Sequence, residues 1–144
     1  RPPRSTLFPS TTLFRSYTTG LKGCKTFELP VELHGNRHVF HLYVIETKKP
    51  EWRDALVDFL VKNQIDAKTH YSIAIHQQAG YPWGKGARIA GSLANAERNA
   101  ATCISLPMFP ELNAEEVDYV IAKVKEWDTQ TASAPERDKV AQAA

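Results

Sequence analysis

The chain has 144 residues, of which 42% are hydrophobic and 24% charged, so it is long enough for one globular domain or a piece of a larger protein. No apolar run approaches the roughly 20 residues of a membrane-spanning helix, and no signal-peptide core is visible. The net charge of +2 reflects three arginines in residues 1–16, whereas residues 17–127 are neutral overall. A neutral body gives no reason to expect a nucleic-acid partner, and we expect no membrane partner either.

The two cysteines, Cys24 and Cys103, lie far apart in the sequence. A single disulfide between them is conceivable. However, the chain has no Cys-x-x-Cys motif and no cysteine-rich spacing, which favours a reduced, cytoplasmic setting.

The two ends differ in character from the rest of the chain. Residues 1–16 contain a near-repeat, and residues 6–16 resemble the translation of a sequencing-adapter DNA, so we interpret 1–16 as a non-native segment. This predicts that the chain is the C-terminal fragment of a longer protein. Residues 128–144 lack large apolar side chains apart from one valine, and we predict a disordered tail there. The predicted domain therefore covers residues 17–127.

The first half of this domain is predicted to contain extended segments and one helix. Residues 17–24 are consistent with the last turn of a helix, and residues 25–32 are expected to be extended. After a turn signal at 35–36, residues 39–45 form the clearest strand, which is apolar on both faces and should be covered on both sides. Apolar residues then recur at i, i+4, i+7 and i+8, which predicts a helix over residues 51–63.

The second half continues the alternation of helices and strands. A short strand is predicted over residues 65–71, a short helix over 95–102 and a buried strand over 103–106. Asn113, followed by two acidic residues, is a good helix start, and the apolar spacing continues to Trp127. The pattern predicts an α/β domain with a small sheet and helices packed on it.

Residues 69–81, THYSIAIHQQAGY, are the candidate polar contact loop. They include His70, Tyr71 and His76 and follow a predicted strand end, where α/β folds often place their sites. Imidazole and phenol groups can contact hydroxyls and phosphates. An ordinary surface loop with hydrogen-bonded histidines explains the same spacing, and the spacing alone favours this interpretation.

Other chemistries find less support. His34, His38 and His41 have a possible metal-ligand spacing, but the turn at 35–36 separates them, so we expect His41 to pack in the sheet and the other two to lie at the turn. There is no Gly-x-Ser-x-Gly nucleophile motif. Cys103 lies in an apolar segment and is interpreted as an inert core thiol.

Three segments together resemble the DegT/DnrJ/StrS-type sugar aminotransferases. Residues 38–45 are similar to the family's H-V-Y-H-L-Y-V-I strand, and residues 69–78 to its I-H-Y-P-x-P-L-H-x-Q segment. Residues 95–98 and 104–112 resemble its closing N-A-E-R and L-S-L-P-M-x-P-x-L motifs. The matches occur in the family's order, and they cover most of the predicted domain.

The resemblance implies a fold type I enzyme that uses pyridoxal 5'-phosphate to move an amino group, usually from glutamate, to a keto nucleotide-sugar. This chain resembles the small C-terminal domain, whose sheet is mainly antiparallel, and lacks the cofactor lysine. The missing large domain would bind the cofactor, and the full-length enzyme would be a homodimer. No catalytic residue is therefore expected in this chain.

The resemblance also implies substrate-binding residues, by position. His70, Tyr71 and His76 match family positions near the nucleotide-sugar, and Gln78 matches more loosely. Two prolines of the family segment are Ser72 and Ala74 here, which predicts a more flexible or differently aimed loop. Two other hypotheses stay open: a free-standing module that binds a nucleotide or sugar without catalysis, and a metal-binding regulatory domain.

Overall fold

The structure is a computed structural model that describes residues 9–36, 38–39, 41–83 and 86–134. Within these residues, the strands β1 (Phe27–Glu28), β2 (Tyr43–Thr47) and β3 (Cys103–Leu106) form one sheet in the order β1-β2-β3. Both strand pairs are antiparallel, and β2 and β3 pair Tyr43 with Leu106 and Ile45 with Ile104. The predicted small antiparallel sheet is confirmed.

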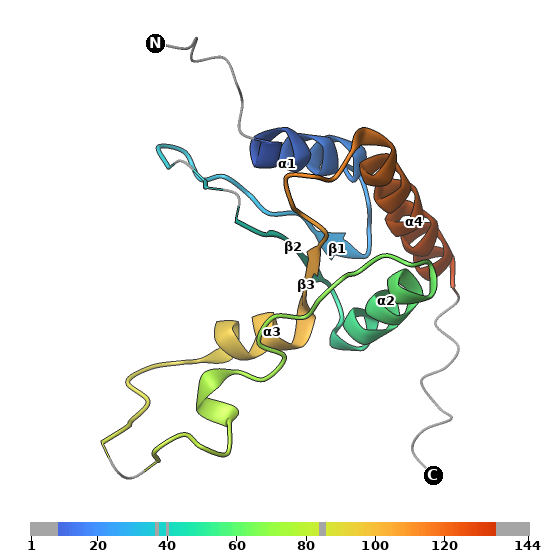
Figure 1. The fold of residues 1–144 in the computed structure, drawn as a ribbon. Helices are drawn as coiled ribbons and strands as arrows, with labels where there is room; N and C mark the ends of the chain where they lie inside the picture. Colours follow the sequence, from blue (N-terminus) through green and yellow to red (C-terminus); the bar gives the residue numbers. More distant parts are fainter. Residues whose placement is uncertain (1–8, 37, 40, 84–85, 135–144) are drawn as a thin grey trace, which may run out of the picture.

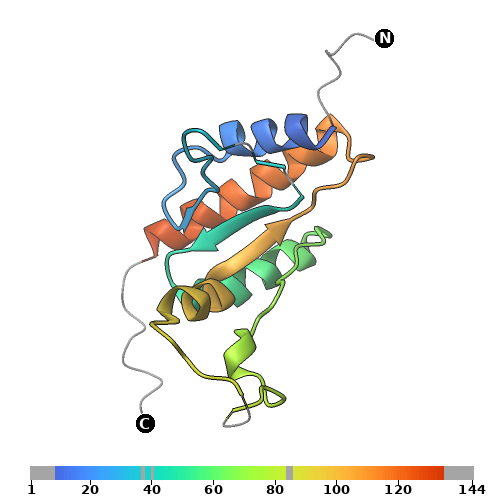
Figure 2. The same cartoon turned by 90° about the vertical axis from the view of Figure 1, so that its left-hand side faces the viewer.

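Helices pack around this sheet, as Figure 1 shows. They are α1 (Pro9–Gly20), α2 (Pro50–Lys62), the 3₁₀ helix η1 (Ile75–Gln77), α3 (Ala94–Thr102) and α4 (Ala114–Ser133). In Figure 2, β2 and β3 run between α1 and α4 above and α2 and α3 below. None of the helices in the described part of the chain is long and apolar enough to cross a membrane.

Local sequence signals explain the starts of α2 and α4. Pro50 occupies the first turn of α2, where its missing N–H costs no hydrogen bond. In α4, the Asn113 side chain accepts from the Glu116 backbone N–H, and the Glu116 carboxylate accepts from the Asn113 N–H, both at 2.9 Å. This reciprocal capping box satisfies two backbone donors that helix geometry would otherwise leave open.

The core lies between the sheet and the helices. Its centre consists of fully or nearly fully buried side chains from five elements and the turn after α1: Tyr17, Leu21, Tyr43, Ile45, Leu56, Leu60, Ile104 and Val124. The Tyr17 hydroxyl donates to the Pro107 carbonyl at 2.8 Å, so its polar end is satisfied inside the core. Burying each large apolar side chain contributes about 1.5–3 kcal/mol, so this cluster dominates the stability of the domain.

The structure extends the domain at its N-terminal end beyond our prediction. We placed residues 1–16 outside the domain, but residues 9–16 belong to α1, and Leu13 and Phe14 are buried. The ring of Phe14 contacts that of Tyr43 in an edge-on arrangement, with 5.2 Å between the ring centroids. The apolar spacing of Leu13, Phe14, Tyr17 and Leu21 accounts for this packing. Residues 1–8 are outside the described residues, and the adapter origin of the segment stays a prediction.

The predicted tail is also shorter than expected, because α4 continues to Ser133. Asp128, which we assigned to the disordered tail, is 7% exposed. Its Oδ1 accepts hydrogen bonds from the backbone N–H groups of Lys25 and Thr26, at 2.9 and 2.8 Å, and from the Thr26 hydroxyl. This long-range contact holds the last turns of α4 against the segment before β1. Residues 135–144 lie outside the described residues.

Two predicted strands differ from the structure. The strand predicted over 39–45 begins only at Tyr43, and His41, expected to pack in the sheet, is exposed before it. The pairing with β3 ends at the Tyr43–Leu106 pair, because Pro107 has no N–H with which to continue the ladder. The strand predicted over 65–71 is reduced to a single bridge between Lys68 and Ser105.

The Asp128 contact gives a test of the C-terminal boundary. Asp128→Ala leaves buried backbone donors without an acceptor and should lower the free energy of unfolding by about 3 kcal/mol, measured by urea denaturation. Asp118→Ala, at an exposed position of the same helix, is the control and should change it by less than about 0.5 kcal/mol. Equal effects of the two variants would contradict a structural role for Asp128.

Candidate functional site

His70 is held beside the free edge of β3. The backbones of Lys68 and Ser105 exchange two hydrogen bonds, at 3.0 and 2.8 Å, which bring the segment after α2 onto this edge. Two residues later, His70 Nδ1 lies 2.8 Å from the Ser105 Oγ. The next residue, Tyr71, has a φ of 57° and a ring that is largely exposed. The bridge and the histidine–serine contact together fix where the polar loop leaves the sheet.

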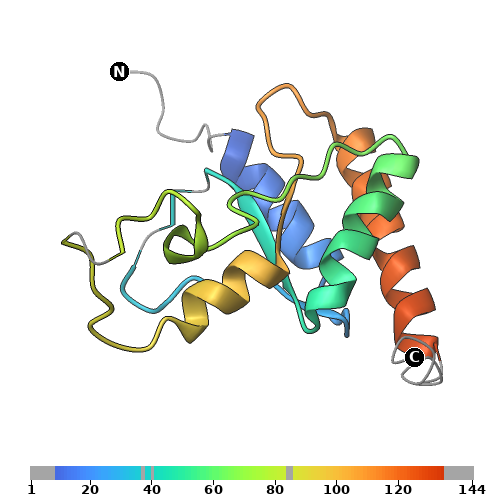
Figure 3. The ribbon, with the colours of Figure 1, turned by 90° about the horizontal axis from the view of Figure 1, so that it is seen from below.

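His76 lies on η1 and is held from two sides. Its Nε2 is 2.9 Å from the Glu97 carboxylate of α3, and its side chain is only 12% exposed. Its backbone carbonyl accepts from the Trp83 indole N–H at 3.1 Å. Figure 3 shows η1 beside α3, in agreement with this contact. The contact between His76 and Glu97 therefore ties the polar loop to the helix that precedes β3.

These elements enclose a groove of about 510 Å³, which we call the histidine groove. His70, Tyr71, residues 73–76 and Tyr81 line it from the loop, and Ala96, Asn99 and Ala100 line it from α3. The small side chains of Ala96 and Ala100 at i and i+4 leave the space open. Cys103, at the start of β3, also belongs to the lining.

The lining of the histidine groove is uncharged apart from its titratable histidines. It contains apolar groups together with two imidazoles, the phenols of Tyr71 and Tyr81, and the amide of Asn99. Burial raises the pKa of the Cys103 thiol, with a smaller contribution from Glu46, so this thiol stays neutral. The groove can thus offer hydrogen bonds and apolar contact to a ligand, and its described lining residues include no lysine or arginine for a phosphate group.

The structure brings three of the four predicted site residues together. His70, Tyr71 and His76 all line the histidine groove, whereas Gln78 is exposed and is not among its lining residues. Sequence reasoning missed the contribution of α3 and the Glu97 contact. The helical spacing of Ala96 and Ala100 was the available signal, but small residues at that spacing also suit ordinary helix packing.

The histidines considered as metal ligands lie elsewhere. His34 lies in the turn and is exposed, while the ring of His38 stacks on Phe14 with 5.8 Å between centroids. His41 is exposed before β2. Among the described residues, no group of three or more histidine, cysteine or acidic side chains is arranged to hold a metal ion.

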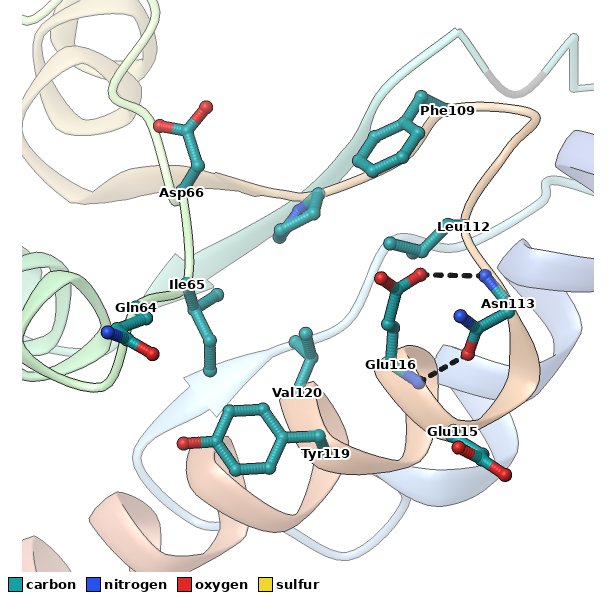
Figure 4. A pocket seen from close by; sticks show the side chains of 11 residues that line it. Gln64, Ile65, Asp66, Phe109, Leu112, Asn113, Glu115, Glu116, Tyr119 and Val120 are labelled. Carbon is teal, nitrogen blue, oxygen red and sulfur yellow. Dashed lines mark hydrogen bonds between the residues drawn. The ribbon is translucent and has the colours of Figure 1, made fainter.

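A second cavity, of about 400 Å³, lies where the start of α4 meets the segment after α2 (Figure 4). Phe109 and Tyr119 border it, together with three acidic residues. Two of its three acidic groups already have partners: Asp66 pairs with Lys68 at 2.8 Å, and Glu116 belongs to the capping box of α4. We therefore assign these groups to the structure of the loop and helix, and we take the histidine groove as the candidate site.

Comparisons with known proteins agree with this architecture. Solved structures that share this three-stranded antiparallel sheet and its helices are fold type I aminotransferases. Residues 8–125 match the DegT/DnrJ/EryC1/StrS aminotransferase family, to which the chain belongs. The family is dependent on pyridoxal phosphate, and its members include sugar aminotransferases.

Individual relatives cover most of this chain. It is 39% identical over 98 residues to the "Pleiotropic regulatory protein" of Geobacillus stearothermophilus, and 35% identical over 115 residues to the dTDP-3-amino-3,4,6-trideoxy-alpha-D-glucose transaminase of Streptomyces venezuelae. These matches cover 68% and 80% of this chain but only 25% and 29% of the relatives. The crystal structure of S. venezuelae DesV in complex with a ketimine intermediate aligns with a TM-score of 0.73 and 33% identity, over 83% of this chain and 31% of that one.

The cysteines give a test of burial at the site and beside Asp128. Burial raises the pKa of the Cys24 thiol to about 11, and Asp128 adds to this shift. At a pH of about 8, Cys24 should therefore react with iodoacetamide about a hundredfold more slowly in the folded chain than in urea, and Cys103 should also be slowed. Mass spectrometry of the labelled peptides measures both rates. Equal rates in the folded and unfolded chain would contradict the burial of these thiols.

Proposed function

We propose that this chain is the C-terminal small domain of a pyridoxal-phosphate-dependent aminotransferase that moves an amino group, from glutamate, to a keto nucleotide-sugar. The observation that carries the proposal is the family match over residues 8–125, which includes the whole histidine groove. The named activity of the Streptomyces venezuelae relative, a dTDP-aminosugar transaminase, supports the substrate class. The chain spans under a third of these relatives, so the activity belongs to the longer protein.

The chemistry of the histidine groove favours contact with the sugar part of such a substrate. A sugar ring presents hydroxyls, which need hydrogen-bond donors and acceptors, and it has apolar C–H faces. The imidazole, phenol and amide groups of the groove can donate and accept hydrogen bonds to the hydroxyls. The apolar groups of the loop and α3 can pack against the C–H faces. The described lining residues include no lysine or arginine, so we assign the recognition of the diphosphate to other residues of the longer protein.

The groove alone does not fit the cofactor. Pyridoxal phosphate needs a lysine amine for its covalent attachment and donors for its phosphate, and the lining residues include no lysine or arginine. We therefore assign the cofactor to the large domain of the longer protein. The role of this chain is to bind and orient the substrate at one side of the site, in a homodimer located in the cytoplasm.

A second function is a free-standing module that binds a nucleotide or sugar without catalysis. The observation that favours it is the groove itself, because its lining combines apolar side chains with hydrogen-bonding imidazole, phenol and amide groups. Specific binding of a nucleotide-sugar by the isolated chain, abolished by His70→Ala, would support this reading over the first.

The two functions differ in what the isolated chain and the longer protein do. We expect the full-length protein to bind pyridoxal phosphate, with its characteristic absorbance, and to transfer the amino group of glutamate to a nucleotide-linked keto-sugar. The isolated chain should show neither property, in the same spectroscopic and coupled assays. A lysine-linked cofactor in the isolated chain, or no transfer by the full-length protein, would contradict the proposal.

The histidines give a test of the substrate side. In the full-length enzyme, His70→Ala and His76→Ala should each raise the KM for the nucleotide-sugar about tenfold, which corresponds to the loss of one hydrogen bond. His34→Ala removes an exposed histidine at the turn before β2 and is the matched control. Equal KM values for all three variants would show that the groove does not contact the substrate.

A further inference from the structure

The two imidazoles of the histidine groove differ in their partners. His70 Nδ1 contacts the Ser105 hydroxyl, which can either donate or accept a hydrogen bond. His76 Nε2 instead contacts the Glu97 carboxylate at 2.9 Å. An ionised carboxylate only accepts hydrogen bonds, so the hydrogen in this contact must belong to His76. The partner therefore leaves the tautomer of His70 open and determines that of His76.

The tautomer decides what His76 can offer a ligand. A neutral imidazole that carries its hydrogen on Nε2 has a lone pair on Nδ1, which then accepts hydrogen bonds. Among the described residues, Glu97 is the only hydrogen-bond partner of this ring, and His76 lines the groove. No described group therefore competes with a ligand for Nδ1.

The rest of the surroundings hold this arrangement in place. The Trp83 indole donates to the His76 carbonyl, and the Trp83 ring packs on Tyr81, with 4.7 Å between centroids. The side chain of His76 is 12% exposed, which limits its alternative rotamers. Glu97 lies in the first turn of α3, on the helix that leads directly into β3. The Glu97 carboxylate therefore lies on a helix that is joined to the sheet, and the His76 imidazole lies on the loop.

We infer that Glu97 is a positioning residue: it fixes the Nε2–H tautomer of His76, so that Nδ1 accepts a hydrogen bond from a ligand hydroxyl in the histidine groove. The assignment of the tautomer follows from the contact between His76 and Glu97. The identification of the ligand hydroxyl as one of the sugar rests on the proposed function. Glu97 contacts the ligand at no point in this scheme and acts only through His76.

The first experiment measures the tautomer in the chain without ligand. The ¹⁵N chemical shifts of the His76 ring, recorded by NMR at a pH of about 9 where an ordinary imidazole is neutral, should show the Nε2–H form favoured at least about tenfold. In Glu97→Gln the amide can donate as well as accept, so this preference should fall below about threefold. A wild-type chain in which Nδ1–H predominates would overturn the inference without any variant.

Two further variants distinguish the effect of the Glu97 carboxylate on the His76 tautomer from the effects of losing another negative charge or a neighbouring hydrogen bond. Glu111→Gln removes an exposed glutamate in the loop before α4 and should leave the His76 shifts unchanged. Trp83→Phe removes the indole donor but keeps the carboxylate, so the tautomer should persist. Backbone amide spectra of each variant establish that the fold is retained. A folded Glu97→Gln variant with the wild-type tautomer ratio would contradict the role of Glu97.

The second experiment tests the acceptor role in the full-length enzyme. Glu97→Gln should raise the KM for the nucleotide-sugar about tenfold with kcat largely retained, and Glu111→Gln should change neither. An unchanged KM in Glu97→Gln overturns the acceptor role. A full-length protein with the expected tautomer but no aminotransfer would instead refute the proposed function and leave the tautomer assignment standing, so the two failures are distinguishable.

Discussion

The histidine groove depends on the pairing of β3 along both of its edges. On one edge β3 pairs with β2 and joins the core, and on the other Ser105 exchanges two hydrogen bonds with Lys68. Because α3 ends at Thr102 and β3 begins at Cys103, no loop separates the helical wall of the groove from the sheet. β3 thus positions both the loop wall and the α3 wall of the groove, and its pairing with β2 connects the groove to the core.

Much of the fold could be predicted from local patterns. The helix around residues 51–63, the strand over 103–106 and the capped start of α4 were each encoded by apolar spacing or a capping residue, and the structure confirms them. Three of the four residues that match the family segment line one groove, and their role in binding a substrate stays a prediction. These signals are local, so a single sequence contains them.

The remaining features depend on contacts between distant residues. The sequence around Asp128 contains no signal that this residue accepts hydrogen bonds from Lys25 and Thr26, about a hundred residues earlier. The apolar residues before Tyr43 look like part of a strand, but the pairing of β2 with β3 ends at Tyr43 and Leu106, next to Pro107. Glu97 similarly looks like an ordinary exposed helix residue until η1 brings His76 to it.

Tyr71 combines an exposed ring with a φ of 57°, a left-handed conformation that costs a non-glycine residue about 1–2 kcal/mol. Glycine or asparagine would relieve this strain but remove the phenol from the groove wall, and β-branched residues would increase it. The backbone and the lining of the groove therefore favour different residues at position 71. Glycine or asparagine there would make the loop more stable, and the groove would lose one hydrogen-bonding group from its wall.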